Sequence, residues 1–116
     1  MQTAQKEFSN PQANAALDAL GNDVRRRIVE ILSAGPLAAG DIAKNFAISR
    51  PAVSKHLRVL ENAGMIEGET VGNRNIYHLE QTGFDHVRHW LDHFWTDALN
   101  RFALFAENSF NAGNDE

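Results

Sequence analysis

A run of hydrogen-bond donors in the middle of the chain has the clearest chemical use of any part of this sequence. The segment SRPAVSKHLRVLEN, residues 49–62, carries Arg50, Ser54, Lys55, Arg58 and Asn62. Guanidinium, ammonium, hydroxyl and amide groups donate hydrogen bonds to phosphate oxygens and to the edges of bases. An exposed element that presents them has the chemistry needed to bind a nucleic acid.

The element that must position these donors is a helix over residues 49–63. Ser49 is a good N-cap, Pro51 falls in the first turn, where a missing N–H costs nothing, and Gly64 ends the helix. Apolar residues recur at the helical period and form one stripe for the core, namely Val53, Leu57 and Leu60. The donors lie on the other side of this helix.

A hairpin is predicted directly after this helix, over residues 65–80. Met65 to Val71 has the pattern of a strand, Gly72 to Arg74 that of a turn, and Asn75 to Leu79 that of the returning strand. A donor-rich helix followed by a hairpin is the plan of a winged helix-turn-helix, which is a mainly α fold with a small β-hairpin.

The residues before the donor-rich helix predict the rest of that fold. The sequence predicts a helix over 12–20, a second helix capped by Asn22, and a short helix over 41–46. Only Ala47 and Ile48 then separate the short helix from the Ser49 helix, as in a helix-turn-helix. Such turns also occur in bundles that never contact DNA. Arg25, Arg26 and Arg27 either join the site or simply cover a surface.

The composition is that of one domain. The chain has 116 residues, 43% of them hydrophobic, and no cysteine, which excludes disulfides and thiolate metal sites. We expect a DNA-binding core over 12–81, a long helix over 83–108, and flexible tails over 1–11 and 109–116. No run is apolar enough to span a membrane and the N-terminus lacks the pattern of a signal peptide, so we expect a cytoplasmic protein without a membrane partner.

The net charge of −4 is unevenly distributed. Residues 22–60 hold seven basic and three acidic side chains, whereas residues 61–116 hold three basic and ten acidic ones. The polarity predicts that the helix-turn-helix end approaches phosphate while the acidic remainder faces away, which lowers non-specific affinity.

The helix over 83–108 carries more aromatic surface than one small domain needs. Its apolar stripe suits a partner copy on one edge and the domain's own core on the other. We expect the terminal helices to form a homodimer interface that contains Phe84, Val87, Trp90, Leu91, Phe94, Trp95, Ala98, Phe102 and Phe105. Packing within a single chain is the alternative.

The whole order from about Ala16 to Glu107 resembles the ArsR family of bacterial winged-helix repressors. The resemblance is most specific over ISRPAVSKHLRVLENAGMI and extends to LDALGNDVRRRIVEILSAGPLAAGDIAKNF. It implies a non-enzymatic homodimeric repressor, or even an autorepressor, on a palindromic operator in double-stranded DNA, with the 49–63 helix in the major groove and the wing beside it. Carried over residue by residue, it implies DNA contacts by Arg50, Pro51, Ser54, Lys55, His56, Arg58, Asn73 and Arg74.

His56 and the wing differ from the other implied contacts. His56 lies at the edge of the apolar stripe, so it either contacts DNA or plugs the interface with a neighbouring helix. The wing departs from the family pattern because Glu67 and Glu69 lie on one face of its first strand and would repel phosphate. Arg74 is then the only cation of the wing and is placed to enter a minor groove.

His86, His89 and His93 are the remaining residues with ligand chemistry. They lie within about a 60° sector of the long helix, opposite the aromatic stripe. The ligand pairs of zinc-sensing relatives are not reproduced here, so we expect no metal, no cofactor and a solvated polar face, with the effector left unknown. Two alternatives stay open, namely a zinc-responsive sensor that uses these histidines and a helix-turn-helix module that binds another protein.

Overall fold

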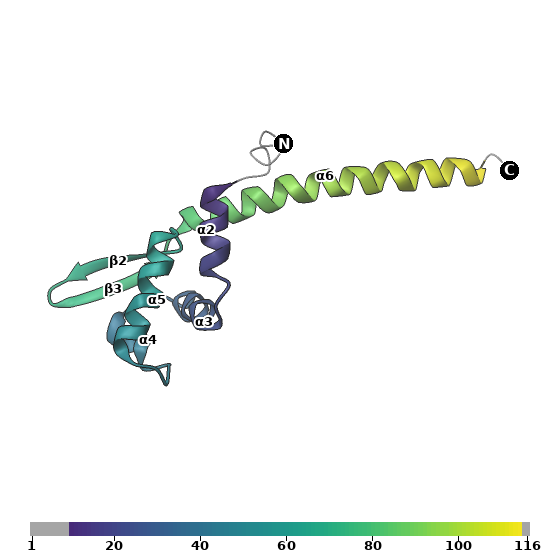
Figure 1. The fold of residues 1–116 in the computed structure, drawn as a ribbon. Helices are drawn as coiled ribbons and strands as arrows, with labels where there is room; N and C mark the ends of the chain where they lie inside the picture. Colours follow the sequence, from purple (N-terminus) through teal and green to yellow (C-terminus); the bar gives the residue numbers. More distant parts are fainter. Residues whose placement is uncertain (1–9, 115–116) are drawn as a thin grey trace.

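A body of short helices and a hairpin, with one long helix projecting from it, is the architecture of this protein (Figure 1). The computed structural model describes residues 10–114, and the surroundings of side chains for residues 10–108. In chain order the elements are α2 (Pro11–Ala19), α3 (Asp23–Leu32), β1 (Leu37–Ala38), α4 (Ala39–Ala43), α5 (Arg50–Asn62), β2 (Ile66–Val71), β3 (Arg74–Leu79) and α6 (Gln81–Asn114). This confirms the predicted winged helix-turn-helix.

Side-chain caps fix where three of the helices begin. The side chain of Asn10 accepts a hydrogen bond from the Ala13 N–H at 3.0 Å, and that of Asn22 accepts from Arg25 N–H at 3.1 Å. The Ser49 hydroxyl accepts from the Ala52 N–H at 3.2 Å and opens α5, as predicted. Each cap satisfies an amide that has no partner within its helix.

The core lies where α2, α3, α4 and α5 meet the base of the hairpin. The three residues of the predicted α5 stripe are buried, with no more than 2% of their surface exposed. They pack with side chains from the neighbouring elements, and the full buried cluster is Ala16, Ala19, Ile28, Leu32, Ile42, Val53, Leu57, Leu60, Met65 and Ile66. Burial of this stripe fixes the outward direction of the opposite face of α5.

The sheet has three strands, not the two of the predicted hairpin. Its order is β1-β3-β2 and all pairings are antiparallel. β1 is the added strand, with Leu37 opposite Tyr77 and Ala38 opposite Ile76. Its two residues leave no alternation for a sequence pattern to detect, so the sequence predicts no strand here. The strand ties the start of α4 to the wing.

Several element boundaries differ from the predicted ones. α2 begins and ends one residue earlier than the predicted 12–20, and α4 covers Ala39–Ala43 in place of 41–46. α6 runs from Gln81 to Asn114, longer at both ends than the predicted 83–108 and into the expected 109–116 tail. Of the two expected tails, residues 1–9 and 115–116 lie outside the described residues.

Candidate nucleic-acid interface

The outward face of α5 presents most of the predicted DNA-contacting residues to solvent. Arg50, Pro51, Ser54, Lys55 and Arg58 are all exposed. The opposite side of the helix is its buried stripe, and α3 and α4 pack against α5. The fold therefore presents a row of cationic and hydroxyl donors on one rigid helix.

His56 lies apart from this row, on the inner edge of α5. It is half-buried, and its Nδ1 lies 3.2 Å from Nη1 of Arg25 on α3. Burial and the neighbouring guanidinium both lower the pKa of His56, and Asp23 opposes them weakly. This position favours the packing alternative for His56 over a DNA contact.

The wing is a two-stranded ribbon with a tight turn. Gly72 adopts a φ of +64°, in the left-handed region that glycine enters at little cost, and Asn73 completes the turn. Glu67 and Glu69 are exposed on β2, and Glu67 lies 3.8 Å from His78 on β3. The wing thus keeps the acidic strand that the sequence indicated.

Close packing of Tyr77 on Gly68 shapes the base of the wing. A Cβ placed on Gly68 would lie 2.8 Å from Cε1 of Tyr77, so only glycine allows the ring to cover β2 here. The Gly68 N–H donates to a carboxylate oxygen of Glu61 at 3.2 Å, which joins β2 to the end of α5. Burial and the nearby Glu61 carboxylate raise the pKa of Tyr77. These contacts connect the end of α5 to the wing.

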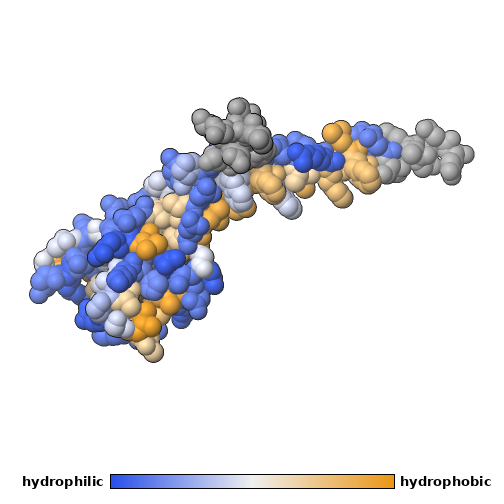
Figure 2. All heavy atoms as spheres, viewed as in Figure 1, coloured by the Kyte–Doolittle hydropathy of each residue, from blue (hydrophilic) through white to orange (hydrophobic). Residues whose placement is uncertain are grey.

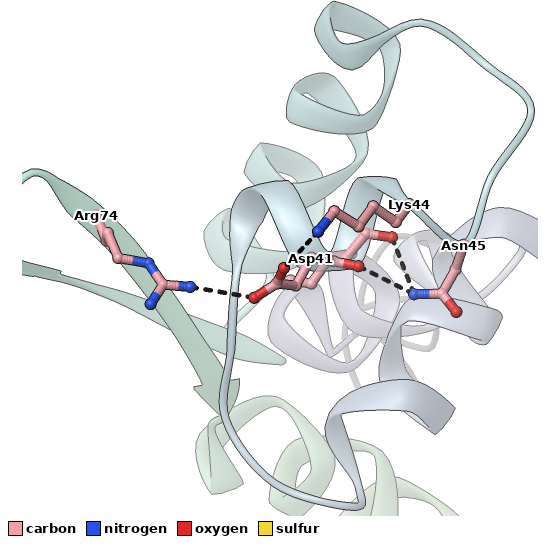
Figure 3. Close-up of polar contacts among 5 residues, drawn as sticks. Asp41, Lys44, Asn45 and Arg74 are labelled. Atoms are coloured by element: carbon pink, nitrogen blue, oxygen red, sulfur yellow. Dashed lines mark hydrogen bonds and ion pairs between the residues drawn. The ribbon is translucent and has the colours of Figure 1, made fainter.

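An open groove of about 280 Å³ lies between α4 and the wing, and we call it the α4–wing groove. The Asp41 carboxylate at its edge accepts a hydrogen bond from Arg74 Nη2 at 3.1 Å and another from Lys44 Nζ at 3.3 Å (Figure 3). The Asn45 side-chain amide donates to the Asp41 carbonyl at 3.1 Å. The groove is lined by Ala38, Ala39, Gly40, Asp41, Arg50, Asn73, Arg74 and Asn75.

The structure therefore divides the predicted DNA-contacting residues into three groups. Arg50, Asn73 and Arg74 converge on the α4–wing groove, whereas Ser54, Lys55 and Arg58 continue along the exposed face of α5 with Pro51 near its start. His56 turns inward. Sequence reasoning missed Asp41, because its partner Arg74 is 33 residues away and no local pattern connects them.

α6 carries an exposed apolar face over most of its described length. Figure 2 shows apolar residues gathered along one edge of the projecting helix. Phe84 and Val87, at its start, pack against the protein's own core. Farther along, large apolar side chains are between 47% and 71% exposed, namely Leu91, Phe94, Trp95, Leu99, Phe102, Leu104 and Phe105. Leu99, at the edge of this face, was not among the residues predicted for it, and Leu104 lies on the opposite side of the helix, about 200° from Phe102 at 100° per residue.

The three histidines considered as metal ligands, His86, His89 and His93, all lie on α6. His86 is half-buried, and His89 and His93 are exposed. Within residues 10–114, no three side chains of His, Asp or Glu come together in a way that suits a metal ion. In the same range no helix is long and apolar enough to span a lipid bilayer.

The fold and the exposed donors on α5 together define a winged helix-turn-helix protein of the DNA-binding class. The profile of the bacterial regulatory protein, arsR family, matches residues 22–67. The chain is 47% identical to the HTH-type transcriptional regulator Rv2034 of Mycobacterium tuberculosis over 80% of this chain and 87% of that protein. This protein belongs to the ArsR family of transcriptional regulators, which are not enzymes.

Other known proteins agree with this assignment. The transcriptional repressor SdpR of Bacillus subtilis is 35% identical over 70% of this chain and 90% of its own length. A crystal structure of an ArsR family transcriptional regulator has a TM-score of 0.71 and 30% identity, covering 76% of this chain and 92% of the other. The homodimeric winged helix-turn-helix domain of Mycobacterium bovis Mb0332 shares the fold, with a TM-score of 0.59 and 23% identity over 89% of this chain and 87% of that one.

Proposed function

We propose that this regulator is a homodimeric repressor that binds a palindromic operator, with α5 in the major groove and the wing along the flanking backbone. The row of exposed donors on α5 is the observation that carries this proposal. A helix of this kind fits the width of the major groove, where base edges present acceptors in a distinct pattern.

The residues divide by chemistry into contacts that specify sequence and contacts that position the protein. Arg50 and Lys55 suit the two acceptors of guanine or a phosphate, Ser54 suits a phosphate or either kind of base, and Pro51 suits the methyl group of thymine. Arg58 lies farther along α5 and suits phosphate. In the wing, Asn73 and Arg74 are the proposed contacts to the flanking duplex.

The exposed face of α6 supports the proposed homodimer. Six large apolar side chains on one side of α6 are about half exposed or more, which is an unusual surface for a monomer, and a second copy of the same helix would cover it. The Mb0332 domain, of the same fold, is a homodimer. Two copies related by a twofold axis would present two α5 helices to two half-sites of a palindrome.

Repression, and control of its own promoter, are the biological outcome that we propose. SdpR, which is named a transcriptional repressor, supports the sign of the regulation. A dimer that covers a promoter blocks polymerase without further chemistry. Action on DNA places the protein in the cytoplasm.

Binding to DNA upstream of its own gene tests the proposal. A footprint should locate a palindromic site, and fluorescence anisotropy should give an affinity that falls steeply with added salt, because bound lysines and arginines release counterions from phosphate. The double variant Arg50→Ala, Lys55→Ala should lose at least about thirtyfold in operator affinity, since each good contact to a base edge contributes about 1–3 kcal/mol.

The matched control is the double variant Arg88→Ala, Arg101→Ala, which removes the same charge from exposed positions on α6. It should keep nearly all of the operator affinity. The proposal is wrong if the wild-type protein binds its upstream DNA no better than a scrambled duplex. It is also wrong if the folded α5 double variant binds the operator as tightly as the wild type does.

A further inference from the structure

The α4–wing groove brings together two arginines from different elements. Arg50 comes from the first turn of α5 and Arg74 from the start of β3. The Arg50 guanidinium lies beside Gly40, where a Cβ would be 3.3 Å from its Nη2. The groove therefore holds two guanidinium groups at the junction of the recognition helix and the wing.

A single carboxylate faces these cations. Asp41 binds Arg74 at 3.1 Å and Lys44 at 3.3 Å, so three cationic groups lie around one anion in this corner of the protein. The Asp41 and Arg74 side chains are 40% and 60% exposed, which leaves the pair open to solvent and to a competing anion. The local excess of positive charge indicates that the groove is suited to a further anion.

A phosphodiester is the anion that matches this geometry. Its two unesterified oxygens accept hydrogen bonds from a guanidinium in the same way as a carboxylate does. If α5 lies in the major groove and the wing lies beside it, the groove between them faces the DNA backbone that separates the two contacts. The polar lining added by Asn73 and Asn75 suits the same ligand.

We propose that the α4–wing groove binds one phosphate of the DNA backbone, and that the Asp41 carboxylate occupies its place on Arg74 in the free protein. This inference rests on the proposed function. On binding, Arg74 exchanges the carboxylate for phosphate, while Asp41 keeps Lys44 as a partner. Because every duplex offers the same phosphate, this competition lowers affinity for all sequences and leaves base contacts to select the operator.

The change Asp41→Asn tests the exchange, because it removes the charge and keeps the shape. Affinity for a duplex of random sequence, measured by anisotropy at several salt concentrations, should rise roughly two- to fivefold, the range expected for loss of one exposed ion pair. In an Arg74→Ala background the same change should raise affinity by a clearly smaller factor, since the competed cation is absent. Thermal unfolding confirms that each variant is folded.

The control variant is Glu69→Gln, which removes one exposed carboxylate from β2 of the wing. Any increase in affinity for random DNA that Glu69→Gln causes should be equal in the wild-type and Arg74→Ala backgrounds. The inference is overturned if the effects of Asp41→Asn and Arg74→Ala multiply independently, or if Asp41→Asn weakens binding to random DNA. If the wild type still selects its operator in those cases, the proposed function stands and only the exchange fails. If the wild type binds no DNA, both fail.

Discussion

At the scale of single residues, Arg25 connects three helices through one guanidinium group. Its Nε donates to the Ala19 carbonyl at 2.6 Å and its Nη2 to the Asp18 carbonyl at 3.2 Å, so it caps the end of α2. Its Nη1 lies 3.2 Å from Nδ1 of His56. Arginine has no acceptor, so Nδ1 must accept, and His56 is neutral with its proton on Nε2. One side chain thus joins α2, α3 and α5.

This arrangement predicts that acid weakens the fold through His56. Its pKa is lowered from 6.5 by burial and by Arg25, so the unfolded chain binds the proton more tightly than the folded one does. Above the pKa that His56 has in the unfolded chain, the neutral histidine contributes its full share to the free energy of unfolding. This share is lost as the pH falls through that pKa toward the lower pKa of His56 in the folded protein. Between about pH 7.5 and about pH 5.5, the unfolding temperature of wild type should fall more than that of His56→Gln.

His89→Gln is the control for that comparison, because His89 is exposed on α6. The remaining histidines are shared by all three proteins, so they affect all three alike. The control should show the full wild-type decrease. Equal decreases for wild type and His56→Gln, measured by circular dichroism, would show that the Arg25–His56 contact carries no pH dependence.

Comparing Ser49 with Asp41 shows which side-chain contacts can be predicted from the sequence. Ser49 and the α5 stripe were predicted correctly because a cap and a helical period act over a few residues. The Asp41–Arg74 and Arg25–His56 contacts join residues 33 and 31 positions apart. Such pairs depend on how elements pack, which local patterns do not specify. The exposed α5 donors were therefore predictable, and the groove beside them was not.

At the scale of elements, two glycines bring the end of α5 against the start of α6. The Gly83 N–H donates to the Gly64 carbonyl at 2.7 Å, and Gly64 has a φ of +74°. A Cβ on Gly83 would lie 2.5 Å from Met65 Sδ and 2.6 Å from the Ala63 carbonyl oxygen. The direction in which α6 leaves the body thus depends on a position without a side chain. The sequence marked Gly64 as a helix end but gave no reason for Gly83.

Gly83→Ala separates local helix preference from packing. Alanine is favoured over glycine inside a helix by about 1 kcal/mol, so preference alone predicts a more stable protein. The clash with backbone atoms of Ala63 and Gly64 opposes this, and overpacking of such a site costs about 1–3 kcal/mol or more. We expect a net loss of stability in urea unfolding.

Gly72→Ala is the matched control for that substitution. Nothing lies within 4 Å of a Cβ at Gly72. The loss of stability in Gly72→Ala should therefore come only from placing alanine at the left-handed φ of +64°, about 1 kcal/mol. It should therefore destabilise the wing turn without moving α6. A Gly83→Ala protein that is as stable as wild type or more so would show that the junction accommodates a side chain.

At the scale of the whole molecule, α6 separates the DNA-facing body from the proposed dimer surface. The helix has 34 residues, which corresponds to about 51 Å at 1.5 Å per residue, and the molecule extends over 74 Å in its longest direction. The basic excess of residues 22–60 lies in the body, whereas α6 holds four acidic and two basic side chains, and four further acidic side chains lie between residues 61 and 80. This polarity, visible in the sequence, agrees with a molecule that approaches phosphate from one end.

The exposed apolar face of α6 gives the prediction at this scale, which is that Phe102→Glu disrupts the homodimer. Phe102 is 69% exposed in the single chain, and a twofold interface would bury it twice. Burial of one large apolar side chain contributes about 1.5–3 kcal/mol, so losing two should weaken dimerisation at least about a hundredfold in sedimentation equilibrium. Operator affinity should fall with it, because each monomer then binds one half-site alone.

Asn100→Glu is the control, because it places the same charge at another exposed position of α6 and should leave the dimer nearly intact. Equal dissociation of both variants would assign the effect to charge and not to the apolar face.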